Sequence, residues 1–308
     1  MLRSVLLTLA PHEGVKRFLT EAVQVRRAVQ RFVAGETLAE ALPAVMALNQ
    51  QGLPATMDHL GESMVDLWGA RRATEAYLEL LDVIFRKRIS SHISVKLTQL
   101  GLDIDTELCL ENMRQILDEA ARCQNFVRID MEGSRYTERT LDLFHYLRRS
   151  YSNVGVVLQA YLYRTEVDLE RLIPLGANIR LCKGAYQESA EIAYPRKSDV
   201  DRNFFKLLEI LMSPRAQRAG VYAAIATHDE KIIQRARSMA NRMGRGLRNF
   251  EFQMLYGIRR DLQVRLARAG YQVRIYVPYG GEWYPYFLRR LAERPANLAF
   301  FLKNLFRG

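Results

Sequence analysis

Eight short apolar runs, each followed by a longer amphipathic stretch, constrain the fold of this chain more than any other feature. The runs lie at residues 54–61, 93–101, 126–133, 154–163, 178–186, 221–229, 250–257 and 273–280. Between them lie segments with helical spacing, such as ELCLENMRQILDEAARC (107–123) and TLDLFHYLRRS (140–150). Near-continuous apolar strands that alternate with helices indicate a parallel sheet covered on both faces.

The number of these units favours one closed barrel. A (βα)8 barrel typically needs about 250 residues, and the eight units fill a span of that size. The alternative, a doubly wound sheet, usually stops at about five or six strands and needs a topological switch point. We therefore expect a TIM-type (βα)8 barrel as the catalytic domain over residues 51–308. Residues 1–50 have helical spacing, with Thr37 or Glu36 near a helix start, and we expect a helical arm packed on or beside the barrel.

Charge and hydropathy limit the classes of binding partner that the chain could have. Lys and Arg total 45 against 34 Asp and Glu, and the net charge of +11 favours nucleic acid, anionic membrane or small anions. No recognisable nucleic-acid module accompanies the charge, so a nucleic-acid-binding protein stands only as an alternative and we expect no nucleic-acid partner. No apolar run approaches the roughly 18 residues of a membrane span. The opening MLRSVLLTLAPHEG lacks a signal-peptide cleavage site, so we expect a cytoplasmic protein.

Several common site signatures are missing from the sequence. The three cysteines, Cys109, Cys123 and Cys182, show no C-x-x-C spacing, which argues against a disulfide framework or a zinc site. The five histidines form no H-E-x-x-H, so we expect no metal. GRGLRN (244–249) lacks the third glycine of a dinucleotide fingerprint, and no P-loop or G-x-S-x-G motif occurs.

Polar residues stand at or near the end of every run. They are Asp58, Lys96, Asp130, Gln159, Lys183, Thr227 with His228, Gln253 and Tyr276. Burying such groups without partners would cost roughly several kcal/mol each. The active sites of (βα)8 barrels lie at the carboxyl ends of the strands. We therefore expect these side chains to converge on one site.

The residues alone leave two enzyme classes open at this rim. Lys96 on a barrel strand would suit a Schiff-base aldolase. Asp58, Glu62 and Asp130 would suit a glycosidase, although the chain has only two tryptophans to stack on sugars. The rim also gathers cations that together would suit an anionic ligand: Arg128, Arg180, Lys183, Arg289 and Arg290.

Seven motifs then give a specific resemblance. VKLTQLG, RIDMEGS, VLQAYLYRT, RLCKGAY, AIATHD, EFQMLYG and RIYVPYG…YPYFLRR resemble, in this order, the barrel motifs of proline dehydrogenase, the FAD-dependent family that oxidises L-proline. The resemblance covers about residues 31–308 and is closest to the monofunctional bacterial form, related to the proline dehydrogenase domain of proline utilisation A. It implies a distorted (βα)8 barrel whose final helix lies over the barrel top. One departure is Cys182, where an aliphatic residue is more usual.

The resemblance also implies an FAD site and its residues. Met131 and Gln159 would meet the isoalloxazine, while Lys183, Gly184 and Ala185 would hold the flavin and its pyrophosphate. Thr227, His228 and Gln253 would complete the cofactor cradle. Two residues would be catalytic: Arg180 would place a cation near flavin N1 and N5, and Asp130 would take part in the proton step or orient the flavin.

The implied reaction is hydride transfer from proline C5 to FAD, which yields Δ1-pyrroline-5-carboxylate in the first step of proline catabolism. Electrons would pass to a membrane quinone. Substrate-binding residues would be Lys96, Tyr186, Leu255, Tyr276, Tyr286, Arg289 and Arg290. If the segment after Pro285 is helical, Tyr286, Arg289 and Arg290 fall at i, i+3 and i+4 and share one face. Glu62 would pair with Arg289 as a gate.

A membrane quinone implies reversible contact with the inner face of the plasma membrane. We expect peripheral contact with an anionic membrane, to which the tail ANLAFFLKNLFRG (296–308) would contribute either an interfacial helix or, as we prefer, a lid on the barrel. The sequence leaves the oligomeric state open.

Overall fold

The computed structural model describes residues 29–293. Within them, eight parallel strands pair in chain order, and the first pairs with the last, so the sheet closes into a barrel. The strands are β1 (Ala55–His59), β2 (Ser91–Val95), β3 (Val127–Ile129), β4 (Val154–Gln159), β5 (Asn178–Cys182), β6 (Tyr222–Ala226), β7 (Phe250–Leu255) and β8 (Val273–Tyr279). All eight overlap the apolar runs, and the predicted barrel is confirmed.

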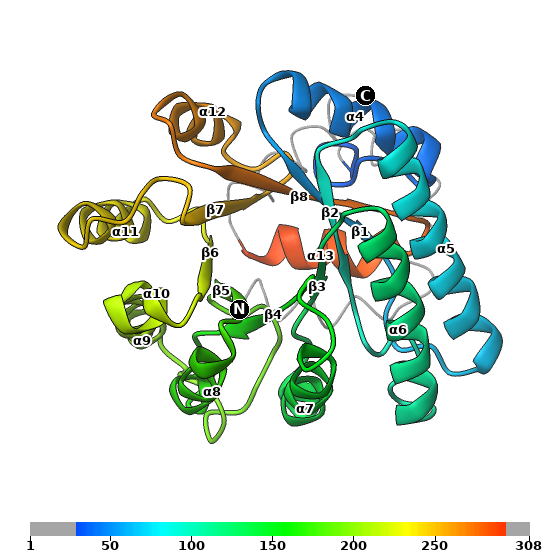
Figure 1. The fold of residues 1–308 in the computed structure, drawn as a ribbon, viewed down its shortest axis with the longest axis horizontal. Coiled ribbons are helices and arrows are strands. Elements are labelled where there is room, and N and C mark those ends of the chain that lie inside the picture. Colours follow the sequence, from blue (N-terminus) through cyan, green and yellow to red (C-terminus); the bar gives the residue numbers. More distant parts are fainter. Residues whose placement is uncertain (1–28, 294–308) are drawn as a thin grey trace.

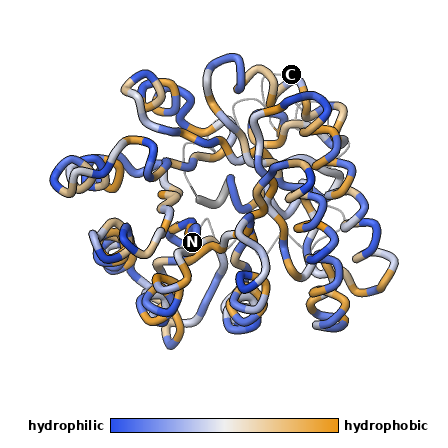
Figure 2. Tube along the Cα trace, viewed as in Figure 1, coloured by the Kyte–Doolittle hydropathy of each residue, from blue (hydrophilic) through white to orange (hydrophobic). Residues whose placement is uncertain are grey.

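A ring of helices surrounds the barrel (Figure 1). It consists of α4 (Leu38–Gln50), α5 (Leu67–Arg86), α6 (Thr106–Arg122), α7 (Thr137–Arg148), α8 (Thr165–Leu172), α9 (Lys197–Met212), α10 (Pro214–Arg218), α11 (Glu230–Arg242) and α12 (Arg260–Arg268). Two 3-10 turns, η1 (Ser134–Tyr136) and η2 (Ile173–Leu175), adjoin α7 and α8. Figure 2 shows hydrophobic and hydrophilic residues alternating along the ring helices, as expected of helices with one face on the sheet.

The helix before the first strand completes the ring. α4 lies between α12 and α5 and contacts β1 and β8 (Figure 1). In a regular barrel the helix after the last strand would take this place. As predicted, Thr37 caps α4, and its side chain accepts a hydrogen bond from the backbone N–H of Glu40 at 3.3 Å. Residues 1–28 lie outside the described part, so the extent of an N-terminal arm stays a prediction.

The helix after the last strand, α13 (Trp283–Glu293), crosses the barrel mouth instead (Figure 1). Phe287 on this helix is fully buried and clusters with Leu60, which follows β1. Leu255 and Tyr276, near the carboxyl ends of β7 and β8, pack against the same cluster. The final helix therefore covers the end of the barrel at which the strands finish.

Residues 29–36, which we call the strap, hold α13 from the other side. The backbone N–H of Ala34 donates to Pro278 O, and Gly280 N–H donates to Gly35 O, both at 2.9 Å. Phe32 belongs to the same buried cluster as Phe287, and their ring centroids lie 6.1 Å apart. The strap thus packs α13 against the barrel.

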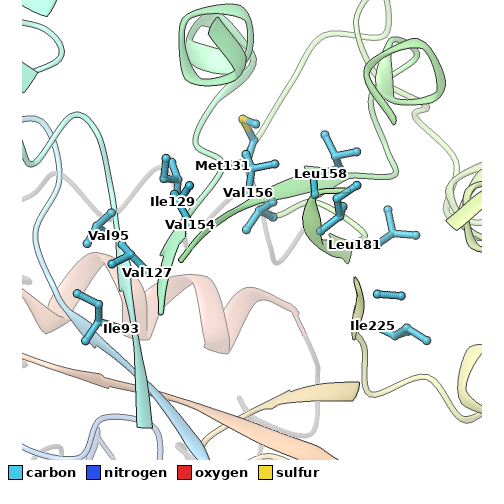
Figure 3. Close-up of a cluster of buried hydrophobic side chains, with 14 of the residues drawn as sticks. Ile93, Val95, Val127, Ile129, Met131, Val154, Val156, Leu158, Leu181 and Ile225 are labelled. Atoms are coloured by element: carbon cyan, nitrogen blue, oxygen red, sulfur yellow. The ribbon is translucent and has the colours of Figure 1, made fainter. Parts of the chain in front are cut away.

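Strand alternation separates an apolar layer from a polar interior. Outward-facing residues such as Ile93, Val127 and Val156 pack in the hydrophobic core that joins sheet and ring helices (Figure 3). Their neighbours along the strands, including Ser94 and Arg128, are buried polar residues. This two-residue period places the polar groups of different strands in the same barrel interior.

Candidate active site

Asp130 lies at the centre of a group of polar side chains in the barrel interior, near the carboxyl ends of the strands. It follows β3, and its carboxylate accepts hydrogen bonds from Arg180 NH1 at 2.6 Å, Ser94 Oγ at 3.1 Å and Tyr276 OH at 2.7 Å. The Arg180 guanidinium also lies over the Tyr276 ring, 5.2 Å from its centroid. Burial, followed by the charge of Asp130, raises the pKa of Tyr276 well above its usual value, so its hydroxyl remains a donor.

Lys96 forms a buried ion pair with Asp58. Its Nζ lies 2.9 and 3.0 Å from the two carboxylate oxygens and 3.8 Å from Asp130. Burial alone would lower the pKa of Lys96, but Asp58 and then Asp130 outweigh it, so the pKa is raised. A Schiff-base lysine needs a lowered pKa to act as a nucleophile. The geometry therefore disfavours the aldolase alternative.

The three carboxylates of the glycosidase alternative are each matched with a cation. Asp58 pairs with Lys96, Asp130 with Arg180, and Glu62 with Arg289. Glycosidases instead direct two carboxyl groups at one sugar bond. The arrangement suits an anionic or zwitterionic ligand, which would take the place of a carboxylate in one of these ion pairs.

The prediction that Arg128 lies at the rim is wrong. Its guanidinium binds Val156 O at 3.1 Å and Asn178 O at 2.6 Å, and Asn178 is the first residue of β5. Arg128 thus reaches the end of the barrel at which the strands begin, because its position on β3 lies opposite the early residue Gly155 of β4. Burial lowers the pKa of Arg128 to about 9.

Above the interior, α13 presents the predicted arginine pair. Arg289 NH2 donates to Glu62 Oε1 at 2.8 Å, and its guanidinium lies 5.8 Å from the centroid of the Tyr186 ring. Arg290 lies over the ring of Tyr286 at 5.0 Å. Burial would lower the pKa of Arg289, but Glu62 and Tyr186 outweigh it and raise it. The segment after Pro285 is helical as predicted, and the helix already begins at Trp283.

A second group of predicted residues lies at the ends of β5 and β6. Lys183 Nζ donates to Asp201 at 2.5 Å and to Asp229 at 2.9 Å. Gly184 has a φ of 114°, and a Cβ there would lie 2.3 Å from the Tyr161 ring. Only glycine fits this position. Ala185 follows it in the loop after β5.

The remaining expected cofactor residues make contacts of their own. Gln159 donates to the backbone oxygen of Glu132 at 2.8 Å, and Gln253 accepts a hydrogen bond from Arg180 Nε. His228 Nε2 accepts from Leu255 N–H at 3.0 Å, and Thr227 Oγ1 accepts from Asp229 N–H at 3.1 Å. The Gln159 and His228 bonds join the ends of neighbouring strands, the Arg180–Gln253 bond joins β5 to β7, and the Thr227 bond lies within the loop after β6.

Met131 lies apart from that group. Its side chain belongs to the hydrophobic layer outside the barrel, with Ile129 and Val156 (Figure 3). The alternation along β3 sends Asp130 inward and Met131 outward. Any contact of Met131 with a flavin would therefore involve its backbone.

Sequence reasoning missed the partners of these groups. Ser94 binds Asp130 and Arg180, while Asp201 and Asp229 hold Lys183. Glu132, two residues after Asp130, is buried and accepts hydrogen bonds from Thr98. Strand parity is the signal that places Ser94 in the interior beside Lys96, whereas Asp201 on α9 carries no such signal.

Within residues 29–293, no cluster of side chains that could hold a metal ion occurs, and no helix is long and apolar enough to cross a bilayer. All three cysteines are free thiols.

Comparisons with known proteins show what this chain is similar to. A family model described as "Proline dehydrogenase" matches residues 41–303. The chain is 45% identical over 280 residues to "Proline dehydrogenase 2" of Bacillus subtilis, with 91% of each chain covered. It is 39% identical over 311 residues to "Proline dehydrogenase" of Deinococcus radiodurans, with 99% of this chain and 98% of that protein covered.

Among solved structures, the fold is similar to that of proline utilization A from Bdellovibrio bacteriovorus inactivated by N-propargylglycine. The TM-score is 0.81 at 24% identity, over 87% of this chain and 33% of that one. The chain thus spans about a third of that longer protein.

Proposed function

The chain belongs to the proline dehydrogenase family, which oxidises proline, and we propose that it transfers a hydride from L-proline to bound FAD and delivers the electrons to a membrane quinone. One observation carries the proposal. Cations converge on the covered end of the barrel, where Arg180 lies in the interior and Arg289 on α13, which crosses that end.

The residues after β5 suit the phosphates of a dinucleotide. Lys183 supplies a cation, Gly184 exposes backbone without a side chain, and the N-terminus of α11 lies nearby through Asp229, its N-cap. A bound pyrophosphate would compete with Asp201 and Asp229 for Lys183. When bound, FAD would supply the hydride acceptor.

Arg289 and Arg290 hold the proline carboxylate, and Lys96 adds a third cation from below. The aromatic rings of Tyr186, Tyr276 and Tyr286, with Leu255, enclose the apolar pyrrolidine ring and exclude water. As the gate moves, Arg289 leaves Glu62 and binds the substrate carboxylate instead.

Asp130 keeps Arg180 in place rather than accepting the amine proton. Arg180, Ser94 and Tyr276 already donate to its two oxygens. A carboxylate occupied in this way is a fixed anchor that directs the guanidinium of Arg180 toward negative charge developing on the acceptor.

Contact with a membrane is supported by an exposed patch beside the gate. Val65, Leu67 and Trp68 are 89%, 49% and 69% exposed, and the Arg71 guanidinium lies 5.9 Å from the centroid of the Trp68 ring. An exposed tryptophan beside cations suits the interface of an anionic bilayer. We propose peripheral contact at the inner face of the plasma membrane. The tail at 294–308 lies outside the described residues, so its role stays a prediction.

An absorption spectrum tests the proposed function directly. The purified protein is expected to be yellow, to release flavin on denaturation and to bleach when L-proline is added without oxygen. A flavin spectrum that proline leaves unchanged would contradict the substrate assignment. A colourless protein trapped by borohydride at Lys96 would favour the aldolase, and retention on DNA at moderate salt would favour the nucleic-acid alternative.

A further inference from the structure

Glu132 is a buried carboxylate that the proposed reaction does not use. It is 3% exposed and accepts hydrogen bonds from Thr98 Oγ1 at 2.5 Å and from Thr98 N–H at 3.2 Å. Its own backbone oxygen accepts from Gln159 at 2.8 Å. The loop after β3 is thereby fixed to the loop after β2.

Thr98 passes this connection on to the loop after β1. Ser63 N–H donates to Thr98 Oγ1 at 3.0 Å, and Met64 N–H donates to Thr98 O at 3.1 Å. Both residues directly follow Glu62, whose carboxylate binds Arg289. Hydrogen bonds therefore connect Glu132, through Thr98, to the two residues that follow Glu62, which pairs with α13.

The backbone of this loop needs support from outside. Ser63 has a φ of 55°, a left-handed conformation that costs a serine energy and persists only where its surroundings fix it. The two bonds to Thr98 supply that support.

We infer that Glu132 is a positioning residue for the gate: through the Thr98 hydroxyl it fixes the loop from which Glu62 holds Arg289. The inference rests on the proposed function, because the gate matters only if α13 covers a proline site. It assigns Glu132 no contact with substrate or cofactor.

The ionisation of Glu132 gives this role a signature. Burial raises its pKa to about 7, the bonds from Thr98 and the charge of Lys96 oppose the rise, and Glu62 adds to it. The other titratable groups that its charge influences are Tyr77, Cys109 and Tyr186, and burial raises the pKa of each. They stay neutral near pH 7, while Lys96 stays charged. An ionised Glu132 accepts both bonds from Thr98, and its protonation weakens them.

Hydrogen exchange of residues 60–66 tests the anchor without any need for activity. In Thr98→Val the Ser63 amide loses its acceptor and is expected to exchange about three- to tenfold faster, the worth of one ordinary hydrogen bond, whereas Met64 keeps its bond to the backbone oxygen of Thr98. Thr98→Ser keeps the hydroxyl and should match the wild type. The Ser134 amide, which donates to Glu188 at 2.7 Å, is the internal control and should not change. Equal exchange at Ser63 in wild type and Thr98→Val would overturn the inference.

Steady-state kinetics then tests the consequence for the gate. Thr98→Val should raise the proline KM about three- to tenfold and change kcat less, because a loosened gate weakens binding before it alters chemistry. In wild type the KM should rise as the pH falls from about 8 to about 6, and Glu132→Gln should remove that step. Glu62→Gln, measured in parallel, identifies any step that belongs to the gate carboxylate.

The two measurements separate the possible failures. If the wild type lacks proline oxidation but Thr98→Val still exchanges faster, the proposed function fails and the anchor stands. If proline is oxidised but the pH step survives in Glu132→Gln, the positioning role of Glu132 is wrong.

Discussion

At the scale of single residues, four cations of the site are paired with carboxylates before any ligand arrives. Lys96, Lys183 and Arg289 all pair with carboxylates, and Arg180 is held on Asp130. Breaking such a buried pair from one side leaves an uncompensated charge and costs about 3–5 kcal/mol. A zwitterionic or anionic ligand lowers this cost for the cation, because the cation keeps a negatively charged partner. Fixed positions and exchangeable partners suit repeated binding and release.

Arg290→Lys tests how the arginine pair recognises its ligand. Lysine keeps the charge but loses the planar fork that can meet both carboxylate oxygens. One charge-assisted hydrogen bond is worth about 1.5–3 kcal/mol, so kcat/KM for proline should fall about ten- to a hundredfold, mostly through KM. Flavin content, measured by absorbance, should be unchanged.

Pyrrolidine, which lacks the carboxylate, is the matched substrate for this variant. Its rate should barely differ between wild type and Arg290→Lys, since the contact is already missing. Equal losses with proline and pyrrolidine would mean that Arg290 shapes α13 instead of holding the carboxylate. Its place over the Tyr286 ring makes that outcome a real test.

At the scale of elements, the periodicity of the sequence predicted the strands and helices that depend on local sequence. Each strand followed from an apolar run because burial on both faces leaves few other ways to satisfy such a run. The helix start at Trp283 was missed because Pro285 suggested a boundary, yet proline fits the first helical turn, where its missing N–H costs nothing. Periodicity alone could not predict the place of α4 in the ring, since it depends on α13 leaving that place vacant.

The strap over α13 can be tested with a pair of glycines. Gly257 has a φ of 74°, and a Cβ there would lie 1.6 Å from the Arg31 carbonyl oxygen. Gly52 has a φ of 73° and nothing within 4 Å of its Cβ position. Gly52→Ala should lose only the roughly 1–2 kcal/mol cost of a left-handed alanine. Gly257→Ala should lose about 1–3 kcal/mol more in urea unfolding, because the strap must move.

The same pair should separate in binding. Displacing the strap removes Phe32 from Phe287, so Gly257→Ala should also raise the proline KM, whereas Gly52→Ala should leave it unchanged. Equal losses of stability in the two variants would mean that the strap yields freely and does not hold α13.

At the scale of the whole molecule, the sequence predicted at which end of the barrel the polar side chains gather but could not predict their pairings. Strand parity brings Asp130 and Arg180 into one interior, yet which carboxylate meets which cation depends on barrel stagger and side-chain reach. The prediction for Arg128 failed for this reason. Strand alternation correctly places Arg128 in the interior, but its side chain extends toward the opposite end of the barrel. Asp201 was missed because it lies on α9, away from any strand end.

The proposed membrane contact belongs to this scale because it depends on which end of the molecule would face the bilayer. α5 has 20 residues and is about 30 Å long, with Trp68 near its start beside the gate and Phe85 near its end. Both rings are exposed, by 69% and 48%, and each has an arginine over it, Arg71 and Arg122. They form a matched pair at opposite ends of one helix.

Trp68→Ser should lower co-sedimentation with phosphatidylglycerol vesicles about three- to thirtyfold, the range expected for one lost interfacial aromatic. Phe85→Ser should leave it unchanged, and added salt should weaken the binding of both variants and the wild type. With a soluble dye as acceptor, Trp68→Ser should oxidise proline at the wild-type rate, while its rate with vesicle-embedded quinone falls. Equal vesicle binding by the two variants would remove the gate end from the membrane. A parallel loss with dye and quinone would place the effect of Trp68 in the gate loop.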